Sequence, residues 1–371
     1  MNKFTRYTLP LMLALAALAH GAPEPTNDKN PAPAEEQLPE EFKAAWAKRD
    51  YVKSREILQP LAEAGNGKAR LIMGFFYEQG WGVQQDFAKA REWFQKSAAS
   101  GNNGAKFELG VYYENGLGDV KPDYAKAREW YEQAAENGHV KAQYFLGSLY
   151  QEGLGVRQDY FKARQWYEKA AAAGNGDAQN SLGVLYYRGL GVERDYAKAR
   201  EWFEQAAEAG DDKFQFILGV MYAEGKGVAQ DYKKAREWFQ KAAAAGNDDA
   251  QNSLGLLYDR GLGVEQDYAK AREWYEQAAG NGNGYAQRNL ARLYFKGLGV
   301  KQDLVKSREW LEKAAAGGDS GAQIALGAFH MYGIGGLDRD EAQALKWFQK
   351  AAAQGDLWAP LFINFMKYKD K

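Results

Sequence analysis

Residues 195–207 are Asp-Tyr-Ala-Lys-Ala-Arg-Glu-Trp-Phe-Glu-Gln-Ala-Ala, and close copies of this stretch recur along the chain. Its tryptophan returns every 36 or 37 residues, as Trp93, Trp130, Trp166, Trp202, Trp238, Trp274, Trp310 and Trp347. An aspartate stands seven residues before each one: Asp86, Asp123, Asp159, Asp195, Asp231, Asp267, Asp303 and Asp340. A fixed period in this range is typical of solenoids, in which helical repeats complete their core by stacking on their neighbours.

The composition excludes several classes of protein. The 371 residues include 48 basic and 49 acidic side chains that are interspersed without a basic stripe, so we do not expect a nucleic-acid partner. The absence of cysteine excludes disulfides, thiolate metal sites and a cysteine nucleophile. The three histidines lie at unrelated positions, so we expect neither a metal nor a cofactor. This composition favours an interaction protein over an enzyme.

The N-terminus has the features of an export signal. Residues 1–19 contain Lys3 and Arg6, followed by an apolar run that reaches Ala19. The run is about half of the ~20 residues that a membrane span needs. We therefore predict a signal peptide over residues 1–19, cleaved between Ala19 and Ala22. The mature chain would have no transmembrane segment and would be periplasmic, if the source is Gram-negative, or secreted.

Two further segments precede the regular repeats. Residues 20–40 contain five of the nine prolines, which predicts a disordered linker that is either a tether or an unselected tail. Residues 41–67 continue the repeat register, but Ile57 occupies the tryptophan position and the helix over residues 41–48 is short. We interpret residues 41–67 as N-terminal capping helices.

The first half of a representative repeat, residues 141–152, predicts an amphipathic helix that we call helix A. Its apolar face is formed by Ala142, Leu146, Leu149 and Tyr150. Gly147 lies beside that face, and glycine recurs at this position in all but one repeat. Because glycine costs a helix about 1 kcal/mol relative to alanine, we expect a close approach of another helix there.

The second half predicts helix B. Asp159 is placed to cap its first turn, and a buried stripe follows in which Trp166 supplies the bulk between small alanines. Gly153 and Gly174 are placed to end helix A and helix B. As helix caps, the repeated aspartates need no catalytic role, and we interpret the tryptophans as core rather than as a ligand-binding strip.

This pattern resembles the Sel-one-like repeat (SLR), a relative of the tetratricopeptide repeat. One repeat matches it at Ala178, Leu182, Gly183, Tyr186, Gly189, Gly191, Val192, Asp195, Lys198, Ala199, Trp202, Phe203, Ala206, Ala207 and Gly210. The resemblance covers residues 68–355 and implies an all-α fold: an α/α superhelical solenoid of about eight repeats, with helix A lining the concave side. The eighth repeat departs at His330, which replaces a tyrosine. Residues 356–371 would form a C-terminal capping helix.

Three positions of helix A vary from repeat to repeat while their neighbours stay constant; in residues 141–152 they are Tyr144, Ser148 and Gln151. These columns are rich in aromatic and aliphatic residues, whereas a solvated face carries mostly charged and amide side chains. We predict a binding surface, the variable face, formed by Phe75, Phe107, Tyr144, Ser148, Asn180, Tyr187, Phe216, Val220, Asn252, Leu256, Arg288, Arg292 and Phe295. The alternative is that the superhelix buries these columns against the next helix A.

Two groups on the variable face suggest a ligand chemistry. Arg288 and Arg292 lie one turn apart next to Phe295, an arrangement able to hold a carboxylate; alternatively, they are locally solvated or paired with glutamates. Asn180 and Asn252 are placed to hydrogen-bond an extended peptide, although a duplication of two repeats also explains their likeness.

Our leading hypothesis is an exported scaffold that binds a protein or peptide in its concave groove. The resemblance implies roles in envelope processes or contact with host proteins. The alternative is an enzyme acting on cell-wall or β-lactam substrates, since cysteine-rich family members from Helicobacter have been associated with β-lactams. The cysteines of that group and any Ser-x-x-Lys motif are missing from this sequence. A structural spacer without a specific ligand is a third possibility.

Overall fold

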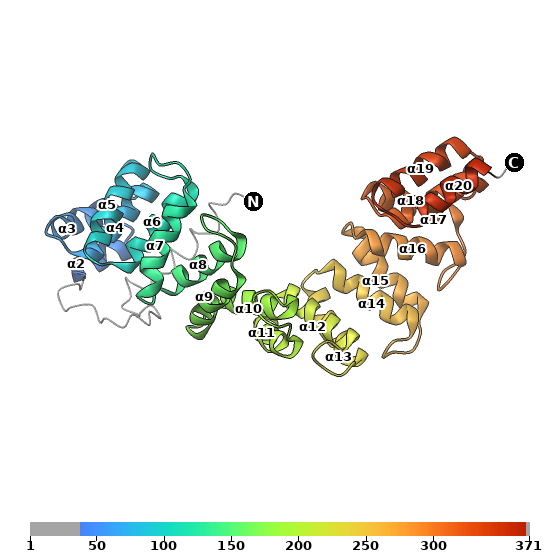
Figure 1. Cartoon of the computed structure of the whole chain (residues 1–371), viewed down its shortest axis with the longest axis horizontal. Coiled ribbons are helices and arrows are strands. Elements are labelled where there is room, and N and C mark those ends of the chain that lie inside the picture. The colour runs from blue at the N-terminus through green and yellow to red at the C-terminus, as the bar shows by residue number, and fades with distance from the viewer. Residues whose placement is uncertain (1–37, 369–371) are drawn as a thin grey trace. The chain divides into compact units, whose positions relative to one another are not determined.

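The computed structural model describes residues 38–368, and every regular element within that range is an α-helix (Figure 1). The predicted signal peptide and residues 20–37 of the predicted linker lie outside the described residues. The prediction of an all-α solenoid of helix pairs is confirmed. The chain divides into two compact units between Asp195 and Tyr196, inside the fourth repeat.

The helices alternate between the two predicted types. Helix A is even-numbered from α4 to α20, and helix B is odd-numbered from α3 to α19. Unit 1 contains α2 (Glu40–Ala47), α3 (Tyr51–Glu63), α4 (Gly67–Gln79), α5 (Phe87–Ala99), α6 (Asn103–Asn115), α7 (Tyr124–Glu136), α8 (Val140–Glu152), α9 (Tyr160–Ala172) and α10 (Gly176–Arg188). Unit 2 contains α11 (Tyr196–Glu208), α12 (Asp212–Glu224), α13 (Tyr232–Ala244), α14 (Asp248–Arg260), α15 (Tyr268–Gly280), α16 (Gly284–Lys296), α17 (Leu304–Ala316), α18 (Ser320–Tyr332), α19 (Glu341–Ala353) and α20 (Ala359–Tyr368).

Within each unit, every helix packs on the helix before it and the helix after it in the chain (Figure 1). A helix A therefore lies between two helices B, as α18 lies between α17 and α19 in unit 2. This arrangement follows from the sequence because a single helix pair leaves an apolar face that only the next helix can cover.

Local capping fixes the helix ends. The predicted aspartates cap helix B; in α9, for example, Asp159 accepts a hydrogen bond from the backbone N–H of Lys162 at 3.0 Å. The predicted glycines end the helices in the left-handed conformation, as Gly153 (φ +72°) does after α8 and Gly174 (φ +85°) does after α9. A second set of caps, which the sequence analysis missed, begins each helix A from α4 to α18: Asn66, Asn102, His139, Asn175, Asp211, Asn247, Asn283 and Asp319.

The recurrent glycine of helix A marks the closest contact inside each repeat. An aromatic ring from helix B packs on the bare backbone at this position, so that a methyl group there would overlap the ring. The described pairs are Gly74 with Phe94, Gly110 with Tyr131, Gly147 with Tyr167, Gly219 with Phe239, Gly255 with Tyr275, and Gly327 with Phe348. This confirms the predicted close approach and identifies a ring, rather than a helix backbone, as the approaching group.

The seventh repeat departs from this pattern in both partners. Helix α16 carries Ala291 at the glycine position, and α17 carries Leu311 at the aromatic position. Both side chains are buried in the same apolar cluster. The larger residue on helix A is thus matched by a smaller one on helix B, because a densely packed core keeps its total volume.

The prediction that the repeated tryptophan is the main core residue is wrong. All eight tryptophans are half-buried, whereas the residue that follows each one is buried; Tyr131, Tyr167, Tyr275, Phe94, Phe203 and Phe348 are among the largest fully buried side chains. One residue rotates the side chain by about 100° around helix B, which moves the tryptophan to the edge of the core. There it joins neighbouring repeats: Trp310 packs against the cluster of its own repeat and against that of the preceding one.

We expect the glycine–aromatic contact to be measurable in unit 2. The substitution Gly219→Ala should lower the free energy of unfolding by up to about 2 kcal/mol, because overpacking against Phe239 costs ~1–3 kcal/mol and alanine returns only ~1 kcal/mol of helix stability. In a Phe239→Leu background, the same substitution should be neutral or stabilising, as the Ala291–Leu311 pair indicates. Urea unfolding of the wild type, the two single variants and the double variant measures the coupling energy between positions 219 and 239. Strictly additive changes in the free energy of unfolding would contradict the contact.

Candidate functional site

The structure does not place all residues of the predicted variable face in contact with solvent. Phe75 and Phe107 are buried and belong to the core of unit 1. Phe295 is 38% exposed, and the rest are half-buried: Tyr144, Ser148, Asn180 and Tyr187 in unit 1, and Phe216, Val220, Asn252, Leu256, Arg288 and Arg292 in unit 2. The accessible part of the predicted surface is therefore a set of half-exposed side chains on each unit.

Phe107 shows why the variable face is partly covered. Its ring lies 5.4 Å from that of Phe145 on α8, the next helix A, and stacks 5.0 Å from the imidazole of His139. The alternative interpretation, in which this column packs against the next helix A, therefore holds at Phe107.

The two arginines of the variable face already have carboxylate partners in unit 2. Arg292 donates to Oδ2 of Asp259, which is only 7% exposed and also accepts from the hydroxyl of Tyr275 at 3.2 Å. The guanidinium of Arg288 lies 3.5 Å from Asp319. The arginines are therefore paired rather than solvated, but their partners are not the expected glutamates. They are Asp259 of the preceding repeat and Asp319, which caps the next helix A.

The two asparagines differ in their partners. Asn252 accepts a hydrogen bond from the side-chain amide of Asn289, at 3.1 Å. In unit 1, the side-chain oxygen of Asn180 is shielded from solvent and has no hydrogen-bond partner within the described residues. An unsatisfied buried acceptor costs about 1–3 kcal/mol, and because this oxygen is shielded from solvent a ligand does not reach it in this conformation.

Two glutamates in unit 1 were missed by the sequence analysis. Burial raises the pKa of Glu108 above its ordinary value, and the charge of Glu78 on the preceding helix A raises it further. Burial also raises the pKa of Glu78, and the pKa of the buried hydroxyl of Tyr112 is raised by burial and by the charge of Glu78. These carboxyls lie on neighbouring helices, 30 residues apart in sequence, so no local motif marks them.

His139 caps the first turn of α8. Its Nδ1 accepts a hydrogen bond from the backbone N–H of Ala142 at 3.2 Å, which requires a neutral imidazole. Burial lowers the pKa of His139 to about 4, with a smaller contribution from the positive charge of Lys141. Among the described residues, no group of three or more His, Asp or Glu side chains is arranged to hold a metal ion.

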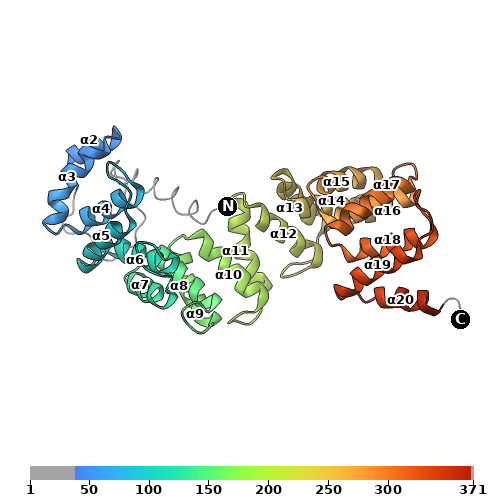
Figure 2. The ribbon, with the colours of Figure 1, turned by 90° about the horizontal axis from the view of Figure 1, so that it is seen from above.

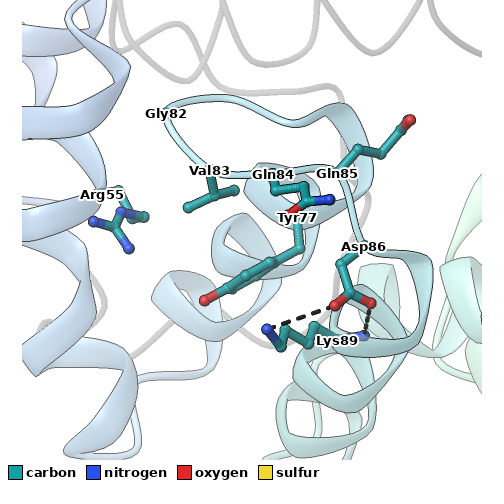
Figure 3. A pocket seen from close by; sticks show the side chains of 8 residues that line it. All are labelled: Arg55, Tyr77, Gly82, Val83, Gln84, Gln85, Asp86 and Lys89. Carbon is teal, nitrogen blue, oxygen red and sulfur yellow. Dashed lines mark hydrogen bonds and ion pairs between the residues drawn. The ribbon is translucent and has the colours of Figure 1, made fainter.

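Two cavities in the described part of the chain lie at junctions between repeats, and Figure 3 shows the first. One, of about 460 Å³, is lined by Arg55 of α3 and by the loop that joins α4 to α5. Beside this loop, Lys89 of α5 lies 5.7 Å from the ring centre of Tyr77 of α4 and 3.6 Å from a carboxylate oxygen of Asp86.

A second cavity, of about 420 Å³, occupies the equivalent place in unit 2. There, Lys270 lies 5.6 Å from the ring centre of Tyr258 and 3.3 Å from Asp267. At the next junctions, Arg272 and Arg308 donate to the loop carbonyls of Gly299 and Gly335. Because the same geometry returns with the repeat, we interpret these cavities as part of the stacking contact.

These features define a class of protein: an α-helical solenoid of stacked helix pairs. The chain belongs to the Sel1 repeat family, whose repeat model matches residues 67–102, 104–139, 140–175, 176–211, 213–247, 248–283, 284–319 and 320–356. The proteins of this family are generally non-catalytic scaffolds for protein interactions. Among residues 38–368, no helix combines the length and apolarity needed to cross a bilayer.

Two solved structures are similar over most of their length. A Sel1 repeat protein from Oxalobacter formigenes is 33% identical, with a TM-score of 0.70, and the match covers 83% of this chain and 89% of that chain. A protective antigen with an SLR fold, present in uropathogenic Escherichia coli strains, is also 33% identical, with a TM-score of 0.61 and coverage of 89% and 79%. A comparison with curated protein sequences returns no significant match.

We expect the cap at His139 to make unit 1 sensitive to acid. The unfolded chain takes up a proton near pH 6.5, whereas the folded imidazole does so only near pH 4, so stability is complete above pH 6.5 and falls between pH 6.5 and pH 4. By pH 5 the loss should be about 1–2 kcal/mol.

The matched variant is His139→Asn, because asparagine caps several of the other helices A and does not titrate. Urea unfolding at pH 7.5 and pH 5 compares the two proteins. We expect the wild type to lose more stability than the variant on acidification, and equal losses would contradict this role of His139.

The contact of Arg292 with Asp259 should be structural. Arg292→Met leaves a buried carboxylate without its cation and should lower the free energy of unfolding by about 2–3 kcal/mol. Arg288→Met, which removes a more exposed ion pair in the same helix, should cost at most about 0.5 kcal/mol. Thermal or urea unfolding measures both changes. If the two substitutions lower the free energy of unfolding equally, the burial of Asp259 does not determine the cost of removing its cation.

Proposed function

We propose that this Sel1 repeat protein is an exported scaffold that binds a protein or peptide on the variable face of helix A. The observation that carries the proposal is the contrast within each helix A. The core positions repeat with little change, whereas the variable face differs from repeat to repeat and, apart from the buried Phe75 and Phe107, is half-buried or exposed in both units. Core packing requires the constant positions, but it gives no reason for the variable face to differ between repeats.

In unit 2, the accessible side chains of α16 suggest the chemistry of the partner. Tyr285, which is 60% exposed, Arg288 and Phe295 lie at intervals of three and seven residues along this helix. The guanidinium of Arg288 lies 5.8 Å from the ring centre of Tyr285. Aromatic and arginine side chains contribute strongly to protein interfaces, so this face suits a segment with apolar and acidic side chains.

The apolar N-terminal segment is the basis for proposing export to the periplasm or secretion. The similar E. coli protein is described as a protective antigen of uropathogenic strains. This supports a place of action in the envelope or in contact with a host.

The test uses a photocrosslinking residue at two positions of unit 2. Benzoylphenylalanine replaces Phe295 on α16 in one protein and Val305, which is 44% exposed on α17, in the matched control. After irradiation of cells that export the protein, we expect a defined partner to crosslink from position 295 and not from position 305. Phe295→Glu should reduce recovery of that partner at least tenfold, without changing helical content or melting temperature, whereas Val305→Glu should not.

Crosslinking that is equal at the two positions would contradict binding by the variable face. The purified mature chain should also be assayed with β-lactams and peptidoglycan. Turnover that one substitution abolishes would replace the scaffold proposal by the enzymatic alternative.

A further inference from the structure

Helix α20 lies beside α19 at the end of the described part of unit 2 (Figure 2), and the residues in and directly before it expose large apolar side chains. Leu357 and Trp358, directly before the helix, are 86% and 66% exposed, and Leu361 and Phe365 are 57% and 54% exposed. We call these four residues the end patch. The neighbouring face of α20 is covered by α19, where the ring of Phe362 stacks 5.0 Å from that of Phe348.

The start of α20 matches the beginning of a ninth helix A. Asp356 accepts hydrogen bonds from the backbone N–H groups of Trp358 and Ala359, as the capping residues of the preceding helices A do. Ala359 is fully buried, like Ala322 at the same position of α18. At the position of the recurrent glycine stands the exposed Asn364, and no helix B follows it within residues 38–368 to place a ring there.

The alignment of α20 with the other helices A shows which element covers the equivalent surface in an earlier repeat. Leu361 occupies the same position in its helix as Phe107 does in α6. Phe107 is buried because the next helix A packs against it through Phe145. Among the described residues no further helix follows α20, so the end patch is a surface shaped for another helix of type A.

Area and charge favour a second copy of the chain as the occupant. With side-chain areas of about 150–250 Å², the four exposed residues present roughly 500 Å², so pairing two copies would remove about 1,000 Å² from water. This value is at the lower limit for specific interfaces and predicts a weak, reversible dimer. Residues 357–365 contain no charged side chain, so the pairing of identical faces meets no like-charge repulsion.

We propose that the end patch is a dimerisation surface, on which the α20 helices of two copies pack face to face about a two-fold axis. A two-fold axis presents the same surface from both copies and closes the assembly at two chains. Leu361 lies in the middle of the end patch and is therefore near the axis, whereas Leu357 and Phe365 lie at its two ends.

The absence of cysteine allows a direct geometric test on the full mature chain. A residue near a two-fold axis faces its own copy, so Leu361→Cys should form an intermolecular disulfide with itself under mild oxidation. Leu357→Cys alone should not, but it should crosslink to Phe365→Cys when the two proteins are mixed. Phe161→Cys, on the exposed surface of α9 in unit 1, is the control and should remain monomeric.

Sedimentation equilibrium between about 1 and 500 μM supplies the second measurement. We expect the wild type and Phe161→Glu to form dimers in the micromolar range, and Leu361→Glu to weaken the association at least tenfold. A wild type that remains monomeric throughout, or association that Leu361→Glu leaves unchanged, would overturn the proposal. Growth beyond dimers would exclude the two-fold arrangement, and binding of monomers to phospholipid vesicles through the end patch would identify a lipid surface instead.

Discussion

The contact of an aromatic ring of helix B with the glycine of helix A sets the spacing of the helices in this protein. It brings the two helices of a repeat close enough for the surrounding alanines to pack. Six glycine–ring pairs among the described residues make this contact. Glycine weakens helix A, but the buried ring contributes more than that loss because an aromatic side chain removes a large area from water. The Ala291–Leu311 pair shows that the constraint acts on the combined volume of two positions.

Features set by local chemistry were predictable from the sequence. The aspartate caps and the terminal glycines depend on a few neighbouring residues, and Asp159 and Gly153 lie as expected. The tryptophan and the aromatic residue after it were not distinguishable, because both recur in every repeat and differ only by one position around the helix. Trp166 and Tyr167 show that a repeat pattern identifies the buried stripe without identifying its centre.

The candidate site was predictable only in part, because exposure on helix A depends on the next repeat. Phe107 is buried by Phe145, and Arg292 is paired with Asp259, which lies 33 residues earlier. In neither pair are the two residues close enough in sequence to form a local motif. Likewise, the pKa of Glu108 is raised first by burial and then by the charge of Glu78 on the preceding helix A, and the repeat period reveals neither cause.

The half-buried tryptophans have a consequence for how mechanical load acts on the chain. Trp310 belongs to the packing of two adjacent cores, and the ammonium group of Lys313 lies 4.0 Å from its ring centre. Pulling one repeat away from the next would therefore uncover a tryptophan before it opened either core completely. Resistance to extension would be spread over successive junctions, each with its own fluorophore, so that a stretched chain would lengthen in steps of about one repeat.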